Sequence, residues 1–496
     1  MFRRRGEKEA SLTNNEILQQ EKVKSPFPKL ADNILFIQQL FVHTEDLIIH
    51  NLSETQSLIF INSLVDSKEI SNKILTRISV QENGLVCDKK IMNLYEVPNL
   101  LLDGYVFYIS EDKAYIAAFN AAVQEKRAIQ EPISEKILKG SHEGFIESLE
   151  SNIHLVRKQI KNPKLMIKYM TLGERSRTKV AVIYIEDLAN EEMINELFRR
   201  LSYAKVDYIQ SPGHIQEFIE DETYSPFPQM LNTERPDRVV ANLMEGRFAI
   251  IADGSPTAMI APISFFAFIQ TPDDYNNRFF IGSFLTLFRT MSLMIVIGLP
   301  SLYIAVVSFH YEIIPFELVL ALKGTLEFVP VPPIIEAVSM LIILELLSEA
   351  ATRLPSPIAQ TIGVVGGLVI GTAVVEANLV SNSMVVVVAL TAVASYTLPI
   401  TEMGTTIRLL SFPLMVASSL FGLVGIVFGL MIILLHLCKL ESFGMPYFTP
   451  FAPFKLSENK DTIVRLPLWK FIKRPTGPRP KDIVRTGNPR GWKKDE

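Results

Sequence analysis

The sequence has very little cysteine, because only Cys87 and Cys438 occur among its 496 residues. The two lie far apart and the second falls in an apolar stretch, which excludes a disulfide scaffold and a cysteine-ligated zinc site. An excess of positive charge is also missing, since 49 Lys and Arg face 53 Asp and Glu, and nucleic-acid binding is therefore not expected. The common nucleotide-loop, nucleophile-elbow, zinc-protease and calcium-loop motifs are absent as well. The sequence predicts neither an enzyme nor a bound metal or cofactor.

Charge is nearly absent from one long block of the chain. Residues 281–438 hold 4 basic and 8 acidic side chains, 12 in 158 residues, whereas residues 1–280 hold 71. So low a density over so long a stretch predicts helices embedded in lipid. Residues 439–496 hold 13 basic and 6 acidic side chains. We therefore expect a polytopic transmembrane helical domain over 281–440, followed by a basic tail over 441–496.

Five apolar segments mark the membrane block: 284–310, 334–350, 357–379, 384–400 and 411–438. No apolar run of signal-peptide length follows Arg3–Arg5, so we expect both the front end and the basic tail in the cytoplasm. Two ends on one side require an even number of crossings. One of the five segments should therefore be broken, re-entrant or buried in protein, because irregular backbone survives at membrane depth only in such places.

The polar front end alternates strand-like and helix-like stretches. After a mobile arm over 1–30, we expect two α/β subdomains, over 31–135 and 136–280. Strand signals lie at 58–61, 105–109, 114–117, 179–187, 206–209, 248–252 and 258–260, and helix signals at 67–80, 141–170, 190–202, 214–220 and 236–244. This alternation predicts sheets with crossover helices. The apolar stretch 248–269 is interrupted by Asp253, Gly254 and two prolines, which favours a strand, a turn and an interfacial helix over a spanning helix.

A few ionisable side chains lie within or beside the apolar segments, and these are the candidate functional residues. Glu345, Glu349 and Arg353 follow at four-residue spacing, which places them on one face of a helix. The others are Arg289, Glu336, Glu376, Glu402 and Arg408. A charge at membrane depth usually faces a bundle interior, a partner or water. Two interpretations stay open: a Glu/Arg network that holds the bundle together, or a lined path for ions or protons.

Glycines at four-residue spacing indicate where helices pack. Gly363, Gly367 and Gly371 form one such series, and Gly425 and Gly429 form a second. Small residues at this spacing let two helix backbones approach closely in lipid. The contact can lie within one subunit or between subunits, and the spacing does not distinguish the two.

Several stretches, in order along the chain, resemble the A subunit of GerA-type spore germinant receptors. The likeness is carried by Val182-Ile183-Tyr184-Ile185-Glu186-Asp187-Leu188-Ala189-Asn190 and by the stretches Ser225–Gln229, Thr233–Val239, Glu349–Pro355, Gly366–Gly371, Phe412–Met415 and Pro446–Pro453. The resemblance runs from about residue 30 to 475. One departure is Thr372 and the acidic Glu376, where the family usually has Gln and Gly.

The resemblance implies a nutrient receptor in the inner membrane of bacterial spores. Its partners would be a transporter-like B subunit, a lipoprotein C subunit, further copies of the A subunit and membrane lipid, with no nucleic acid. The A subunits would oligomerise into a germinant-gated cation path, and rings of acidic side chains favour cations. Two alternatives stay open: a non-conducting scaffold that transmits the state of its partners, and a secondary transporter with broken helices.

Overall fold

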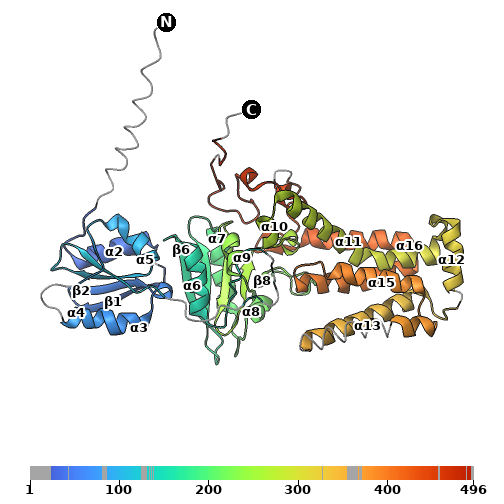
Figure 1. Cartoon of the computed structure of the whole chain (residues 1–496), viewed down its shortest axis with the longest axis horizontal. Coiled ribbons are helices and arrows are strands. Elements are labelled where there is room, and N and C mark those ends of the chain that lie inside the picture. Colours follow the sequence, from blue (N-terminus) through green and yellow to red (C-terminus); the bar gives the residue numbers. More distant parts are fainter. Residues whose placement is uncertain are drawn as a thin grey trace, which may run out of the picture.

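The computed structural model describes residues 24–492, apart from 43, 81–85, 124–130, 133, 134, 136, 138, 327, 355–366, 368–370, 456, 457 and 488. Two β-sheets with their helices lie in series at one end of the molecule, and a bundle of long helices forms the other end (Figure 1). Most of the expected arm over 1–30 and most of the apolar segment 357–379 lie outside the described residues.

The first sheet has five antiparallel strands in the order β1-β2-β4-β5-β3. Their bounds are Leu47–Ser53 (β1), Gln56–Ile61 (β2), Lys89–Ile91 (β3), Tyr105–Ser110 (β4) and Ile116–Asn120 (β5). Phe107 and Ile109 face helices α2 (Leu30–Leu40) and α5 (Val97–Leu102). Val106 and Tyr108 face the opposite layer, built from α3 (Ser67–Glu69), a π-helical turn and α4 (Leu75–Val80). This alternation along β4 buries both faces of the sheet.

The second sheet repeats the plan, with five antiparallel strands in the order β6-β7-β9-β10-β8. Their bounds are Leu165–Leu172 (β6), Thr178–Ile185 (β7), Leu231–Thr233 (β8), Phe248–Ala252 (β9) and Ala258–Ala261 (β10). Ile183 faces helices α6 (Leu149–Gln159) and α9 (Pro236–Leu243). Val182 faces α7 (Glu191–Tyr203) and α8 (Pro212–Ile219). Buried Val, Ile and Ala on both faces explain why β7 gives the strongest strand signal of the polar front end.

Several expectations for this region are wrong. Every described strand pair is antiparallel, so the helices do not serve as crossovers between parallel strands. The helix expected over 141–170 ends at Gln159, and residues 165–172 form edge strand β6. Residues 206–209 form no strand, although Ile209 is buried. The interpretation of 248–269 as a strand, a turn and a short helix instead of a spanning helix is confirmed, because it contains β9, a turn, β10 and the 3₁₀ helix Phe265–Phe268. That helix is buried in the core, so it is not the interfacial helix that we expected.

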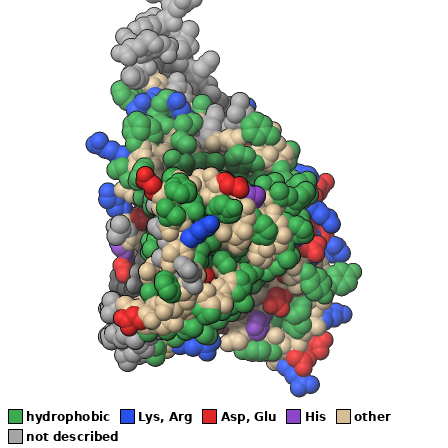
Figure 2. Space-filling view, turned by 90° about the vertical axis from the view of Figure 1, so that its right-hand side faces the viewer, with side chains coloured by type: hydrophobic (Ala, Val, Ile, Leu, Met, Phe, Trp, Pro, Cys, Tyr) green, Lys and Arg blue, Asp and Glu red, His purple; other side chains and the backbone are tan. Residues whose placement is uncertain are grey.

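The helical end begins with α10 (Pro272–Asn276), which leads into α11 (Phe279–Phe309). The other described helices are α12 (Phe316–Leu326), α13 (Pro333–Arg353), α15 (Asn382–Ser395) and α16 (Thr401–Lys439). By length and apolar composition, α11 and α16 are the two described helices that could span a membrane. Hydrophobic and uncharged side chains make up most of the surface at the far end of the bundle, with isolated charged ones among them (Figure 2).

Helix α16 is a helical hairpin that reverses at Gly422, where φ is 58° and ψ is −138°. Thr406 Oγ1 donates to Pro226 O at 2.7 Å, and His436 Nε2 lies 2.8 Å from Ser225 Oγ. A straight helix would separate residues 406 and 436 by about 45 Å, at roughly 1.5 Å per residue. Both ends of α16 therefore lie beside the second sheet, and Gly422 forms the distant tip.

The basic tail packs against the second sheet's helices instead of extending freely into solvent. Lys481 N donates to Leu188 O at 2.9 Å, and Arg474 Nε donates to Met244 O at 2.9 Å. Pro478 and Pro480 are buried. The tail contains two short strands, β11 (Glu441–Ser442) and β12 (Met445–Pro446), and two 3₁₀ turns. Figure 1 shows it beside α10, where the sheets meet the helical bundle.

Candidate functional site

Glu345 of α13 and Arg408 of α16 form an ion pair between two helices. Arg408 Nε lies 2.9 Å from Glu345 Oε2, and the second guanidinium nitrogen lies 3.2 Å from Oε1. The Arg408 side chain is 18% exposed and that of Glu345 is 45% exposed. Both carboxylate oxygens are engaged, so this pair holds α13 against the first half of α16.

Glu349 and Arg353 pair within α13, one helical turn apart. The guanidinium lies 2.6 Å from Glu349 Oε1, and both side chains are largely exposed. The four-residue spacing thus produces a contact between Glu349 and Arg353, whereas Glu345 binds Arg408 on another helix. An exposed pair of this kind stabilises a helix only slightly, by about 0.3–0.5 kcal/mol.

Glu336, at the start of α13, is completely buried. Its Oε2 accepts a hydrogen bond of 2.9 Å from Ser381 N, and Ser381 in turn caps the first turn of α15. Its Oε1 has no hydrogen-bond partner among the described residues. The carboxylate thus joins the starts of α13 and α15, which is a packing role within one chain.

Arg289 of α11 binds Asp274 of α10 through two bonds, of 2.7 and 2.9 Å. The same guanidinium donates to Ile269 O at 3.2 Å and to Thr271 Oγ1 at 3.1 Å. Thr271 and Asp274 also form the capping box of α10. Arg289 therefore fixes the angle at which the chain passes from the second sheet into its first long helix.

The remaining two acids differ in their contacts. Glu402, in the first turn of α16, accepts a 3.2 Å hydrogen bond from Asn232 of β8. Glu376 is exposed, and within the described part of the chain no ion pair involves it. Glu336 is buried, and Glu345 and Glu349 are each paired with an arginine, so Glu376 differs from these three acids in being exposed and unpaired with any described cation.

The two glycine series have different surroundings. An added Cβ at Gly429 would lie 2.5 Å from Leu414, and one at Gly425 would lie 2.0 Å from Ala417 O, so these glycines pack within the α16 hairpin. An added Cβ at Gly367 or Gly371 would meet nothing within 4 Å. Gly363 lies outside the described residues. The described glycines of the first series therefore present an open surface.

Tail residues 461–465 lie across the entry to α11, and we call this segment the strap. The sequence did not predict it. Arg465 is 4% exposed and donates to Asp274 O and, at 3.2 Å, to Asn277 O. Ser283 Oγ of α11 donates to Arg465 O at 2.7 Å. Arg465 and its partners are 182 to 191 residues apart in the sequence, so no helical or strand periodicity could have predicted these contacts. Basic composition alone therefore did not distinguish Arg465 from its neighbours.

The strap also contains a buried acid. Tyr275 Oη donates to Asp461, and Gln270 donates to the Asp461 carbonyl. Burial raises the pKa of Asp461 to about 7, helped by the charge of Glu245, while the Tyr275 hydrogen bond and the charges of Arg465 and Arg485 oppose this rise. Burial also raises the pKa of Tyr275 well above its usual value. The Asp461 carboxyl can therefore change its charge near neutral pH, at the junction between the sheets and the helices.

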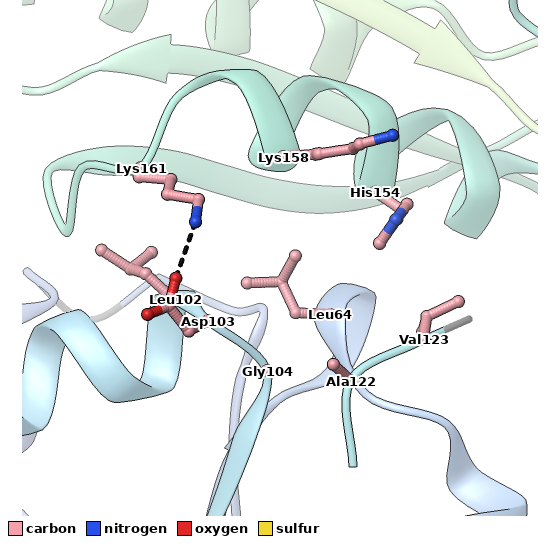
Figure 3. A pocket seen from close by; sticks show the side chains of 9 residues that line it. All are labelled: Leu64, Leu102, Asp103, Gly104, Ala122, Val123, His154, Lys158 and Lys161. Carbon is pink, nitrogen blue, oxygen red and sulfur yellow. Dashed lines mark hydrogen bonds and ion pairs between the residues drawn. The ribbon is translucent and has the colours of Figure 1, made fainter. Parts of the chain in front are cut away.

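A pocket of about 320 Å³ lies between the two sheet units (Figure 3). Lys161 Nζ bridges its mouth to Asp103 at 2.6 Å, and His154 Nδ1 lies 2.8 Å from Ser63 O. Lys158 is paired with Glu143 at 3.2 Å. Its polar side chains thus have partners, which makes it a seam between the units. Among the described residues, no group of three or more His, Cys, Asp or Glu side chains could hold a metal.

Comparison with known proteins gives a consistent result over most of the chain. A sequence model described as "Bacillus/Clostridium GerA spore germination protein" matches residues 36–477. The "Spore germination protein KA" of Bacillus subtilis (strain 168) is 36% identical over 95% of this chain and 90% of its own. The "Spore germination protein A1" of the same organism is 37% identical over 90% of this chain and 96% of its own.

Two further similarities were found. The "Uncharacterized membrane protein YfkQ" of Bacillus subtilis (strain 168) is 42% identical over 77% of this chain and 75% of its own. The crystal structure of the N-terminal domain of the A subunit of the Bacillus megaterium spore germinant receptor GerK3 is 26% identical. It covers 49% of this chain and 98% of its own, with a TM-score of 0.38.

Proposed function

Because the chain belongs to the GerA family of spore germination proteins, and is thus a germinant receptor subunit, we propose that copies of it form a germinant-gated cation path in the spore membrane. The sheet units and the tail would act as the cytoplasmic gating platform, and the helical end would form the path. Its partners would be a transporter-like B subunit and a lipoprotein C subunit. The location would be the spore inner membrane.

The connectivity of the helical end supports a common side for the sheets and the tail. Both ends of α16 lie beside the second sheet, through the contacts of Thr406 and His436. With the hairpin counted as two passes, the five apolar segments give an even number, as the basic tail requires. The break at Gly422 is the kind of irregularity that we expected in one of the five segments.

The observation that carries the proposal is that Glu376 is exposed and forms no ion pair with any residue that the structure describes. Glu336 is buried, Glu345 is paired with Arg408, and Glu349 is paired with Arg353. Glu376 is exposed and follows Gly367 and Gly371, whose surroundings are open. An exposed acidic side chain at membrane depth can form a ring when copies assemble, and such rings favour cations.

The test is potassium release from spores that carry Glu376→Gln. Glu312→Gln is the matched control, because Glu312 is also exposed and lies in the turn after α11. We expect slower germinant-triggered potassium release from Glu376→Gln at an unchanged receptor level, and normal release from the control. Normal release from both variants would contradict a role of Glu376 in conduction.

A non-conducting scaffold is the second candidate, and the paired charges favour it. The contacts Glu345–Arg408, Arg289–Asp274 and Glu336–Ser381 all join elements of one chain. A protein that transmits motion between partners needs such rigid joints and no free carboxylate. Assembled receptors that stay silent in planar bilayers when germinant is added would support the scaffold over the cation path.

A further inference from the structure

A cavity of about 650 Å³ lies where the second sheet, the start of the helical end and the basic tail meet. Helix α9 and the loop before α10 form one wall, and tail residues 468–478 form the other. The volume falls in the range of small-molecule sites, roughly 300–1,000 Å³. Neither the sheet contacts nor the proposed cation path makes use of this space.

The floor of the cavity carries an incompletely satisfied arginine. Arg247 is 9% exposed, and its terminal nitrogens reach Asn242 Oδ1 and, at 3.2 Å, Glu245 Oε2. Its Nε is buried and has no hydrogen-bond partner among the described residues. A buried N–H without an acceptor costs about 1–3 kcal/mol, and a ligand oxygen would remove that cost.

The mouth of the cavity is cationic and apolar. Lys473 and Arg485 are exposed there, and in the described part of the tail neither has an ion-pair partner. Leu468 and Ile472 stand beside them, at 55% and 48% exposed. Free cations next to apolar side chains match a phosphate that is attached to a carbon skeleton.

Four acids line the cavity, and each has a partner. Asp237 is paired with Arg235, Glu245 with Arg247 and Glu458 with Lys455, and Asp461 is bonded to Tyr275. Their oxygens are acceptors, so they suit hydroxyl groups on the ligand better than a second anion. The polar floor thus favours a phosphate ester that carries a hydroxylated group.

The place of the cavity in the fold indicates where this chemistry is at hand. The nearby first turns of α11 expose Phe280 and Phe284, at 73% and 65%. Aromatic side chains exposed at the end of an apolar helix are typical of the membrane–water interface. Basic side chains beside that interface attract anionic lipid, at about 1 kcal/mol for each charge.

We propose that this cavity binds a phosphate ester of a polyol, with Lys473 and Arg485 holding the phosphate and Arg247 donating to the hydroxylated part. The source is either the headgroup of an anionic phospholipid or a soluble ester such as glycerol phosphate. A bound ligand would touch both walls, and would therefore hold the tail strap against the entry to α11. The inference does not depend on whether the protein conducts cations.

Binding to the full-length protein in a neutral detergent tests the proposal, with dihexanoyl phosphatidylglycerol, glycerol phosphate and dihexanoyl phosphatidylcholine as probes. The variant Lys473→Ala/Arg485→Ala removes two charges from the mouth. The control Lys89→Ala/Lys90→Ala removes two exposed charges from the first sheet. We expect the mouth variant to bind phosphatidylglycerol about tenfold more weakly or worse, and the control to bind as the unchanged protein does.

The outcomes separate the two ligand sources. Binding of phosphatidylglycerol without glycerol phosphate assigns the cavity to lipid, and binding of both at similar strength assigns it to a soluble ester. Equal binding of phosphatidylcholine and phosphatidylglycerol, equal binding by the two double variants, or no binding of either phosphate ester would overturn the proposal. Arg247→Gln, which retains an amide donor, is a further variant in the floor of the cavity. We expect it to bind phosphatidylglycerol more weakly while its thermal unfolding midpoint stays unchanged.

Discussion

Asp46 and Arg157 form a completely buried ion pair that joins the two sheet units. Arg157 lies on α6 of the second unit, and Asp46 directly precedes β1 of the first unit. The Arg157 guanidinium is 3.3 Å from Asp46 Oδ2, and both side chains are 0% exposed. Asp46 also accepts from Ser63 Oγ at 2.6 Å. Burial lowers the pKa of Arg157, and the charge of Asp46 partly restores it. The two sheets therefore share a fixed joint.

Asp46→Asn should destabilise the protein strongly, because it leaves the Arg157 charge buried without its partner. Loss of one member of a buried pair costs about 3–5 kcal/mol. The matched control is Asp103→Asn, which breaks the exposed Asp103–Lys161 pair and should cost about 0–1 kcal/mol. Thermal unfolding of the full-length protein in detergent compares them. Equal midpoints for the two variants would show that the buried pair does not hold the units together.

Gly422→Ala should disturb the tip of the α16 hairpin. The left-handed backbone there is strained for any residue with a Cβ, and that Cβ would lie 2.9 Å from His310 Nε2 and 3.1 Å from Phe309. We expect a loss of about 1–3 kcal/mol in stability. Gly298→Ala, in the middle of α11 with nothing within 4 Å, is the control and should not destabilise the protein. Thermal midpoints in detergent compare the two, and identical midpoints would contradict the hairpin geometry.

Glu345→Gln should weaken the contact between α13 and α16, because the neutral amide offers Arg408 one acceptor oxygen in place of a charged carboxylate with two. Partial exposure limits the cost to about 1–2 kcal/mol. Glu349→Gln removes an exposed pair within one helix and should change stability by less than about 0.5 kcal/mol. Retention of the assembled receptor in detergent at rising temperature measures the difference. A larger loss of stability in Glu349→Gln than in Glu345→Gln would contradict the finding that Glu345 is the acid that joins α13 to α16.

The docking of the tail should depend on pH through Asp461. Its pKa in the folded protein, about 7, lies above the ordinary value of 3.8, so the folded state prefers the neutral acid. The stabilising contribution is complete below about pH 4 and is lost as pH rises through 7. Hydrogen exchange of residues 461–485 should therefore become faster between about pH 4 and pH 7 and level off above that, after correction for the intrinsic rate. Asp461→Asn should remove this change, and an unaltered pH profile in that variant would exclude Asp461 as its cause.

Periodicity predicted the elements whose stabilising contacts are local. Helices α7 and α9 and strands β2, β4 and β7 occur close to their expected places, because their buried faces repeat at the helix or strand period. Strand β6 was assigned to a helix since Lys168 and Tyr169 are only partly buried on the sheet edge, and its alternation is weak. The pairing direction of the strands has no local signal, which explains the wrong expectation of crossovers.

The candidate residues show the same limit. Spacing within one helix predicted the contact of Glu349 with Arg353, whereas the choice of Arg408 by Glu345 depends on how two helices meet. The reversal at Gly422 was hidden because this glycine stands beside Gly425 and Gly429 in one apolar run, which we interpreted as a packing surface. The backbone angles at Gly422 and the contacts of Ser225 and Pro226 with the two ends of α16 reveal the hairpin in the structure.

The sign of the charge at position 376 provides the most direct test of the cation path. The measurement is the reversal potential of the assembled receptor in a planar bilayer under a potassium chloride gradient, with germinant present. We expect cation selectivity in the unchanged protein, a shift of the reversal potential toward chloride in Glu376→Lys, and no shift in Glu312→Lys. An identical reversal potential in the unchanged protein and Glu376→Lys would contradict the proposal that Glu376 lines the path.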